Sequence, residues 1–100
     1  MEFLQIIEYQ TSKPEELQAV GEEFRALREA EGGPGPVQLF AGKDRDRDNV
    51  YLTIVRFPSY EVAMENSQRQ DTGELSSRMA ALCDGPPTFR NIDVMMQYGG

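Results

Sequence analysis

The sequence has 100 residues, a mass of 11.3 kDa and a formal net charge of -7. This length suits one domain, and we expect residues 1–100 to form a single one. Nucleic acids and anionic membranes attract positively charged surfaces, so the acidic composition argues against both as partners.

Missing residue types narrow the function further. The chain has no histidine, which removes the commonest general base, the commonest metal ligand and the usual haem ligand. Cys83 is the only cysteine, so no disulfide can form within the chain. The N-terminal segment has no basic region, and no apolar run approaches the roughly 20 residues of a membrane span. We therefore expect a cytoplasmic protein.

The first predicted elements are a strand and a helix. The run from Phe3 to Tyr9 is rich in β-formers and apolar on both faces, so we expect a strand that is covered on both sides. Ser12 and Glu15 match the S-x-x-E capping box and predict a helix start. Gly32, followed by Gly33 and a proline, predicts its end. The apolar stripe of this helix is Leu17, Val20, Phe24 and Leu27.

A hairpin follows, with strands over residues 37–41 and 50–57. Its loop contains the run DRDRD, residues 44–48, in which acidic residues alternate as they do at the start of a calcium-binding loop. Such a loop also needs glycine at its sixth position and glutamate at its twelfth, where this sequence has Asn49 and Val55. We therefore predict a solvated hairpin in which arginines neutralise the acids, and no metal site.

The last elements are a helix and a strand. Pro58 ends the third strand, and Ser59 is a typical N-cap for a helix from residue 60 to about residue 67. The helical pattern then weakens and resumes over residues 74–83, and residues 89–98 predict a last strand. The order β-α-β-β-α-β predicts an α+β, ferredoxin-like fold, with an antiparallel sheet and helices on one face.

The second face of this sheet is also expected to be apolar. Leu52 and Ile54 alternate with aromatic and β-branched residues in the third strand, and Ile92 alternates with Asp93 in the last one. One set meets the helices, and the other needs a cover that this chain does not supply. A second copy of the sheet would supply it, so we expect a homodimer whose sheets close into a barrel.

Two strand arginines, Arg56 and Arg90, also need partners. A strand arginine on the barrel-facing side would pair with a carboxylate or open to water at the barrel mouth, and Asp93 is a candidate partner. The alternative is a pair that holds the anionic group of an acidic substrate.

The junction Arg56-Phe57-Pro58-Ser59-Tyr60-Glu61, together with the order of elements, resembles the dimeric α/β-barrel proteins. Among them it looks like the antibiotic-biosynthesis-monooxygenase-like group. That group includes cofactor-independent oxygenases of quinol-like aromatics, haem-degrading enzymes and proteins with no known activity. The resemblance implies a pocket between the sheet and the helices of each subunit.

The sequence departs from the active members of that group. Its oxygenases place an asparagine in the first strand and a tryptophan at the end of the third, where this chain has approximately Gln5 and Phe57. Its haem-degrading members need a histidine in the second helix, so we expect no haem here.

The alternation of the strands gives the candidate pocket. If Phe57 faces the helices, then every second residue of the first and third strands does so too. The expected ligand-binding residues are Gln5, Tyr9, Tyr51, Thr53, Phe57, Met64 and Asn66. An apolar pocket with these few polar groups would suit a flat aromatic or polyketide-like molecule. The alternative is an ordinary helix–sheet core with phenol groups at its rim.

Three functions remain open. The first is an oxygenase-like or cyclase-like enzyme that acts on an aromatic small molecule without metal or haem. The second is a non-catalytic small-molecule-binding or accessory protein on the same scaffold. The third is a dimerisation module whose partner is another protein. No residue is singled out as catalytic.

Overall fold

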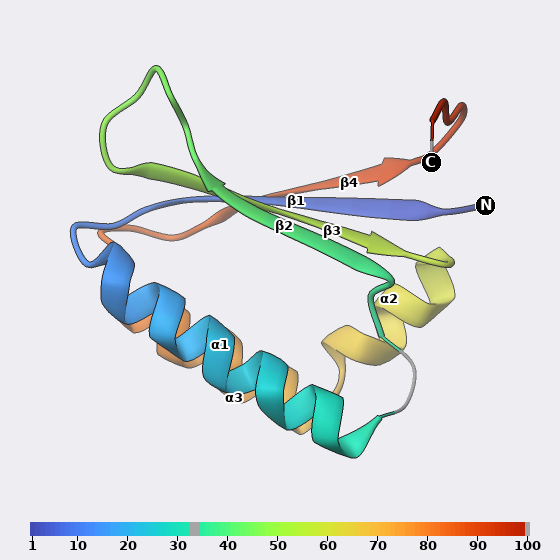
Figure 1. Ribbon diagram of the computed structural model, residues 1–100, viewed down its shortest axis with the longest axis horizontal. Coiled ribbons are helices and arrows are strands. Elements are labelled where there is room, and N and C mark those ends of the chain that lie inside the picture. Colours follow the sequence, from blue (N-terminus) through green and yellow to red (C-terminus); the bar gives the residue numbers. More distant parts are fainter. Residues whose placement is uncertain (33–34, 100) are drawn as a thin grey trace.

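The computed structural model describes residues 1–32 and 35–99. Its elements, in chain order, are β1 (Phe3–Gln10), α1 (Pro14–Glu31), β2 (Gln38–Lys43), β3 (Val50–Phe57), α2 (Tyr60–Ser67), α3 (Gln70–Ala81) and β4 (Thr88–Asp93). The strands form an antiparallel sheet in the order β2-β3-β1-β4, with the helices on one side of it (Figure 1). The predicted α+β, ferredoxin-like fold is confirmed.

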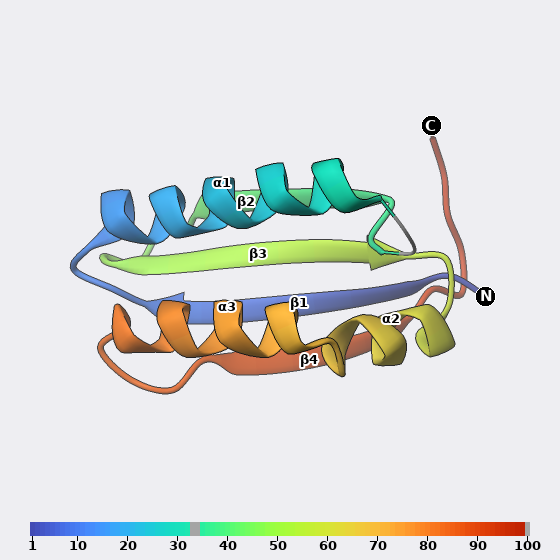
Figure 2. The same cartoon turned by 90° about the horizontal axis from the view of Figure 1, so that it is seen from below.

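The helices form one layer below the sheet. Figure 2 shows α1 along β2 and β3, and the α2–α3 pair along β1 and β4. The opposite face of the sheet carries no helix in the described part of the chain (Figure 1). The molecule therefore has two unlike faces, one of helices and one of bare strands.

The junction between β3 and α2 forms as the sequence predicts. Ser59 has extended backbone angles, φ -159 and ψ 164, and its hydroxyl accepts a hydrogen bond of 3.2 Å from the backbone N–H of Val62. This bond satisfies one of the N–H groups that a helix start leaves without a partner. Ser59 is the predicted N-cap.

The start of α1 differs from the prediction of a Ser12 capping box, which is wrong. Its N-cap is Lys13, with no side-chain cap. The backbone N–H of Lys13 instead donates to the Thr11 hydroxyl at 2.9 Å, and that fully buried hydroxyl donates to the carbonyl of Leu82 at 2.6 Å. Ser12 turns away and its hydroxyl donates to the Asp84 carboxylate at 3.5 Å. The end of the helix at Gly32 is as predicted, and Gly33 lies outside the described residues.

Two other boundaries also move. The second helical segment resumes at Gln70 rather than at residue 74, after Arg69 adopts an extended conformation, φ -69 and ψ 143. The last strand ends at Asp93 rather than at residue 98: Asp93 pairs with Phe3, the first residue of β1, and one more backbone hydrogen bond of 3.0 Å follows, from the N–H of Val94 to the carbonyl of Glu2.

One cluster of buried apolar side chains lies at an end of the helix–sheet sandwich. Its members, Phe3, Val55, Phe57 and Ala63, come from β1, β3 and α2, and Val62 and Met64 pack against them. The ring centroids of Phe3 and Phe57 are 6.4 Å apart, and Tyr60 meets Phe3 edge-on at 5.3 Å. Each buried phenylalanine stabilises the fold by roughly 1.5–3 kcal/mol relative to an exposed one. The Pro58–Ser59 corner thus lets α2 pack against the Phe3–Phe57 pair of β1 and β3.

Candidate functional site

The face of the sheet that meets the helices is fixed by the register of its strands. Phe3 and Phe57 are cross-strand partners in the core, so every second residue from each faces the helices as well. The pairs that follow along the strands are Gln5 with Val55, Ile7 with Thr53, and Tyr9 with Tyr51. Five of the candidate residues, Gln5, Tyr9, Tyr51, Thr53 and Phe57, lie on this face.

Burial is uneven along this face, which has the buried Phe57 at one end and the buried Tyr9, 9% exposed, at the other. Phe57 is 3% exposed, whereas Gln5, Ile7, Tyr51 and Thr53 all remain partly exposed. Two of the helices opposite also bury few side chains. The buried residue of α1 is Leu17. All residues of α3 are described, and none of them is buried. Core side chains of a small domain are normally excluded from water. Solvent therefore reaches the middle of the space between the helices and the sheet.

A pair of tyrosines lies at the far end of the same face. The rings of Tyr9 and Tyr51 are stacked, with centroids 6.1 Å apart and planes at 16°. The Tyr9 hydroxyl and the Thr53 hydroxyl are 3.3 Å apart and hydrogen-bonded. Beside Tyr9, where β4 separates from β1, a hollow of about 220 Å³ is lined by Glu8, Tyr9, Gln10, Gly85, Pro86 and Thr88. Aromatic and hydroxyl groups thus combine at this end.

The remaining candidates lie apart from the tyrosines. Gln5 donates from its amide to the side chain of Asn91 at 3.3 Å, midway along the sheet. Met64 packs against the buried core near Phe57. Asn66 accepts a 2.8 Å hydrogen bond from Arg28, which ties α2 to α1.

The seven candidates therefore line a strip and do not converge on one point. Tyr51 and Phe57 are six residues apart on one strand, which corresponds to roughly 20 Å. The structure brings Tyr9, Tyr51 and Thr53 together at one end of the strip. It places Phe57 and Met64 in the core at the other end.

Two polar side chains beside the candidates, Asn91 and Arg28, are not among those expected from the sequence. Asn91 lies opposite Gln5 because alternation along β4 carries it to the helix side. Arg28 follows Phe24 by one helical turn, and its guanidinium carbon lies 5.4 Å from the centre of the Phe24 ring. Helical spacing alone would have placed Arg28 on the apolar stripe.

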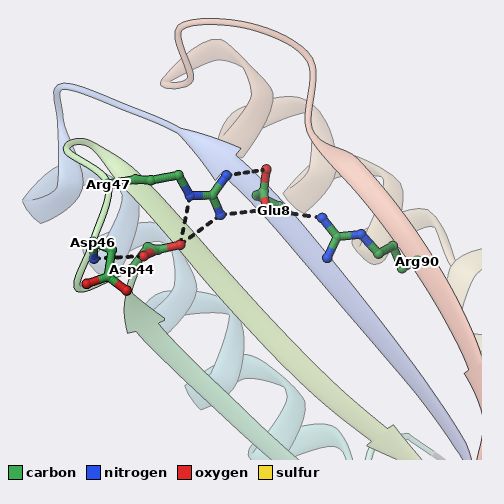
Figure 3. Close-up of polar contacts among 5 residues, drawn as sticks. All are labelled: Glu8, Asp44, Asp46, Arg47 and Arg90. Carbon is green, nitrogen blue, oxygen red and sulfur yellow. Dashed lines mark hydrogen bonds and ion pairs between the residues drawn. The ribbon is translucent and has the colours of Figure 1, made fainter.

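The opposite, helix-free face carries an ion-pair cluster at the hairpin end. Figure 3 shows Glu8 of β1 between Arg47 of the hairpin and Arg90 of β4. The distances to Glu8 are 3.0 Å from Arg47 and 3.2 Å from Arg90, and Arg47 also contacts Asp44 at 2.7 Å. The hydrogen bond from Arg47 is the main reason that the pKa of Glu8 lies below its ordinary value, and Arg90 adds to it.

The same cluster neutralises Asp44, one of the acidic residues of the hairpin. The pKa of Asp44 is lowered first by a hydrogen bond from the backbone N–H of Asp46, at 2.9 Å, and then by Arg47. Within residues 1–32 and 35–99, no three acidic or cysteine side chains gather as metal ligands would.

Both strand arginines form ion pairs with carboxylates of the same chain. Arg90 pairs with Glu8, and Arg56 pairs with Glu2 at 3.7 Å. The suggestion of Asp93 as a partner is wrong, because Asp93 lies opposite Phe3 and shares the helix-facing side. Cys83 is partly buried, and burial, with the neighbouring Asp84 carboxylate, raises the pKa of its thiol.

Several solved structures have the same fold as this chain. One neighbour is SnoaB, a cofactor-independent oxygenase from Streptomyces nogalater, with a TM-score of 0.79 and 16% identity over 96% of this chain and 95% of that one. The chain has the fold of these proteins. A second is a proposed antibiotic biosynthesis monooxygenase from Caulobacter crescentus, with a TM-score of 0.81 and 14% identity over 95% of this chain and 91% of that one.

A third neighbour is a dimeric ferredoxin-like protein of unknown function from Jannaschia, with a TM-score of 0.77 and 11% identity over 94% of this chain and 100% of that one. These similarities confirm the predicted resemblance at the level of the fold. No protein-family model matches the sequence, and none of the curated proteins matches it either. In the described residues, no helix is long and apolar enough to cross a membrane.

Proposed function

We propose that this protein binds a flat aromatic small molecule between its helices and its sheet, without haem or metal. The observation that carries the proposal is the partial exposure of aromatic and apolar side chains that face the helices. Tyr51, Ile7 and Thr53 keep contact with solvent although they point into the sandwich, while Phe57 on the same face is buried. An aromatic ligand would cover these side chains, stack on the tyrosines and exchange hydrogen bonds with Tyr9 or Thr53.

The proposal includes a homodimer formed through the helix-free face of the sheet. Phe40, Ile54 and Ile6 are adjacent across three strands on that face, and Phe40 is 58% exposed. Met95 and Met96, which follow β4, are also exposed. Contiguous exposed apolar surface of this kind is typical of interaction sites, and a second copy of the sheet would bury it.

Binding is tested with a dihydroxyanthraquinone probe, titrated into the full chain and followed by its absorbance. We expect saturable binding that Tyr51→Ala weakens about tenfold. Tyr98→Ala is the matched control, because it removes the same side chain from a position that is 98% exposed, outside the sandwich. A saturated decalin diol of similar size controls for unspecific apolar binding. Equal affinity of Tyr51→Ala and wild type for the probe would refute the site.

A second candidate function, oxidation of the bound aromatic by dioxygen, is favoured by the fold shared with the cofactor-independent oxygenase SnoaB. It is tested by oxygen uptake with a dihydroxynaphthalene in metal-chelated, flavin-free buffer, against the same buffer without protein. If oxygen uptake with the protein equals uptake in buffer alone, the catalytic function is refuted and the binding function is unaffected.

A further inference from the structure

A groove runs between α1 and α3. It has a volume of about 360 Å³, and its apolar lining residues are Phe24, Ala26, Leu27 and Leu75. Ala26 lies nine residues after the buried Leu17, which places the two on opposite sides of α1 at 100° per residue. Phe24, seven residues after Leu17, lies on the same side of α1 as Leu17, so the groove extends from the sheet-facing side of the helix to solvent. Leu27 was expected in the core-facing stripe, but it is 48% exposed at this groove.

The rim of the groove is mainly acidic. Glu23, Asp71, Glu74 and Arg78 complete its lining. Arg78 forms an ion pair with Glu23 at 2.9 Å, and Arg69 forms one with Asp71 at 3.0 Å. Glu74 accepts a long hydrogen bond of 3.4 Å from Gln70, its neighbour by one helical turn. The Glu74 carboxylate can therefore accept a stronger hydrogen bond from a charged donor.

The acidic character extends over the whole helical layer. Segments 14–31 and 60–81, which hold the three described helices, contain ten of the 17 acidic residues and four of the 10 basic ones. Their net charge is therefore -6, ten negative against four positive, out of the -7 of the chain. The sheet and its loops are nearly neutral. The negative field is thus concentrated on the surface that contains the groove.

We propose that this groove docks a cationic, amphipathic helical segment of another protein. The apolar floor would take two or three leucine-like side chains spaced by three or four residues, which is how amphipathic helices enter grooves. Lysine or arginine side chains on the flanks of that segment would meet Glu74 and the surrounding acidic surface. Opposite charge over the whole layer would also speed the encounter and make it sensitive to salt.

A second copy of this chain fits the groove poorly. The helical layer of the second copy would bring its own charge of -6 toward the first, and like charges across an interface oppose association. The proposal is tested separately from the small-molecule site, because Leu27 and Glu74 line the groove and are not among the candidate ligand-binding residues.

The test uses a fluorescein-labelled 14-residue peptide with leucines at helical spacing and lysines elsewhere, titrated into the full chain and followed by anisotropy. The control peptide carries glutamate in place of every lysine. Leu27→Gln removes apolar surface from the groove. Glu74→Lys and Glu65→Lys are a matched pair, because each changes the charge by the same amount on the exposed helical surface but only Glu74 lines the groove.

We expect the lysine peptide to bind, with an affinity that falls at least fivefold between 50 and 300 mM salt, as screening of exposed charges predicts. Leu27→Gln and Glu74→Lys should each weaken binding about fivefold or more, and Glu65→Lys less than twofold. Circular dichroism and urea midpoints confirm that the variants are folded.

Three results would overturn the proposal. Equal losses from Glu74→Lys and Glu65→Lys would mean attraction to the acidic layer without docking in the groove. Equal binding of the glutamate peptide would mean unspecific apolar association. Dissociation of a homodimer by Leu27→Gln would assign the groove to a second copy of the chain.

Discussion

Phe57→Ala tests the contrast between the buried cluster around Phe57 and the more exposed middle of the sandwich. Phe57 is 3% exposed and packs with Phe3, Val55 and Ala63, so its truncation would leave a cavity in the tightest part of the protein. Phenylalanine-to-alanine changes in such cores cost about 3–5 kcal/mol of unfolding free energy. With a urea m-value of roughly 1.5 kcal/mol per M for a chain of this size, the urea midpoint should fall by about 2–3 M. Far-ultraviolet circular dichroism measures it.

Phe89→Ala is the matched control for this experiment. Phe89 also faces the helices, opposite Ile7 on β4, but it is 52% exposed. Its truncation should change the unfolding free energy by about 1 kcal/mol or less, because little buried surface is lost. If the two variants lost similar stability, or if Phe57→Ala stayed within about 1 kcal/mol of wild type, the contrast between the buried cluster and the exposed middle of the sheet would be refuted.

Three further predictions concern the helix-free face and its hairpin. Ile54→Lys places a charge at the centre of the exposed apolar row, so light scattering should show a monomer or insoluble protein; a soluble dimer of unchanged stability would contradict the proposed interface. Calorimetric titration of calcium should reveal no site at the hairpin tighter than on the order of 1 mM, because the run DRDRD lacks the required glycine and bidentate glutamate. Glu8→Gln should destabilise the protein at pH 7, and the difference should shrink as the pH falls below 4.5. The folded-state pKa of Glu8 is depressed, so its ion pairs stabilise the fold above the ordinary pKa and are lost on acidification; a difference independent of pH would contradict this.

The type and order of the elements could be predicted because local chemistry determines them. The proline and serine at residues 58 and 59 define a strand end and a helix start without help from distant residues. The elements that moved did so for tertiary reasons. Ser12 does not cap α1, because the Thr11 hydroxyl accepts from the N–H of Lys13. That hydroxyl is fixed by its hydrogen bond to the carbonyl of Leu82, which is 71 residues away. Arg69 interrupts the second helix with its side chain tied to Glu31 and Asp71.

The candidate site shows the same limit. Alternation correctly assigned Gln5, Thr53, Tyr51 and Phe57 to one face, because the side-chain period of a strand is fixed at two. It could not distinguish Phe57, which is buried, from Tyr51, which is not. Both are aromatic, and both occupy equivalent positions on β3. The difference comes from α2, whose Ala63 belongs to the same buried cluster as Phe57, and no local pattern in β3 encodes where a later helix will pack.

The distribution of charge connects the two proposed interfaces. Glu8, Asp44 and Glu2 on the sheet side are each matched by an arginine of the same chain, so that face is apolar and nearly neutral. The helical layer carries almost the entire net charge. When two copies meet, repulsion between helical layers is avoided if the neutral sheets face each other and the acidic layers point outward. Self-association through the sheet would therefore leave the groove between α1 and α3 exposed on both sides of the dimer. A change of charge on the sheet, such as Ile54→Lys, should disrupt the dimer and leave binding of the lysine peptide intact, whereas Glu74→Lys should do the reverse.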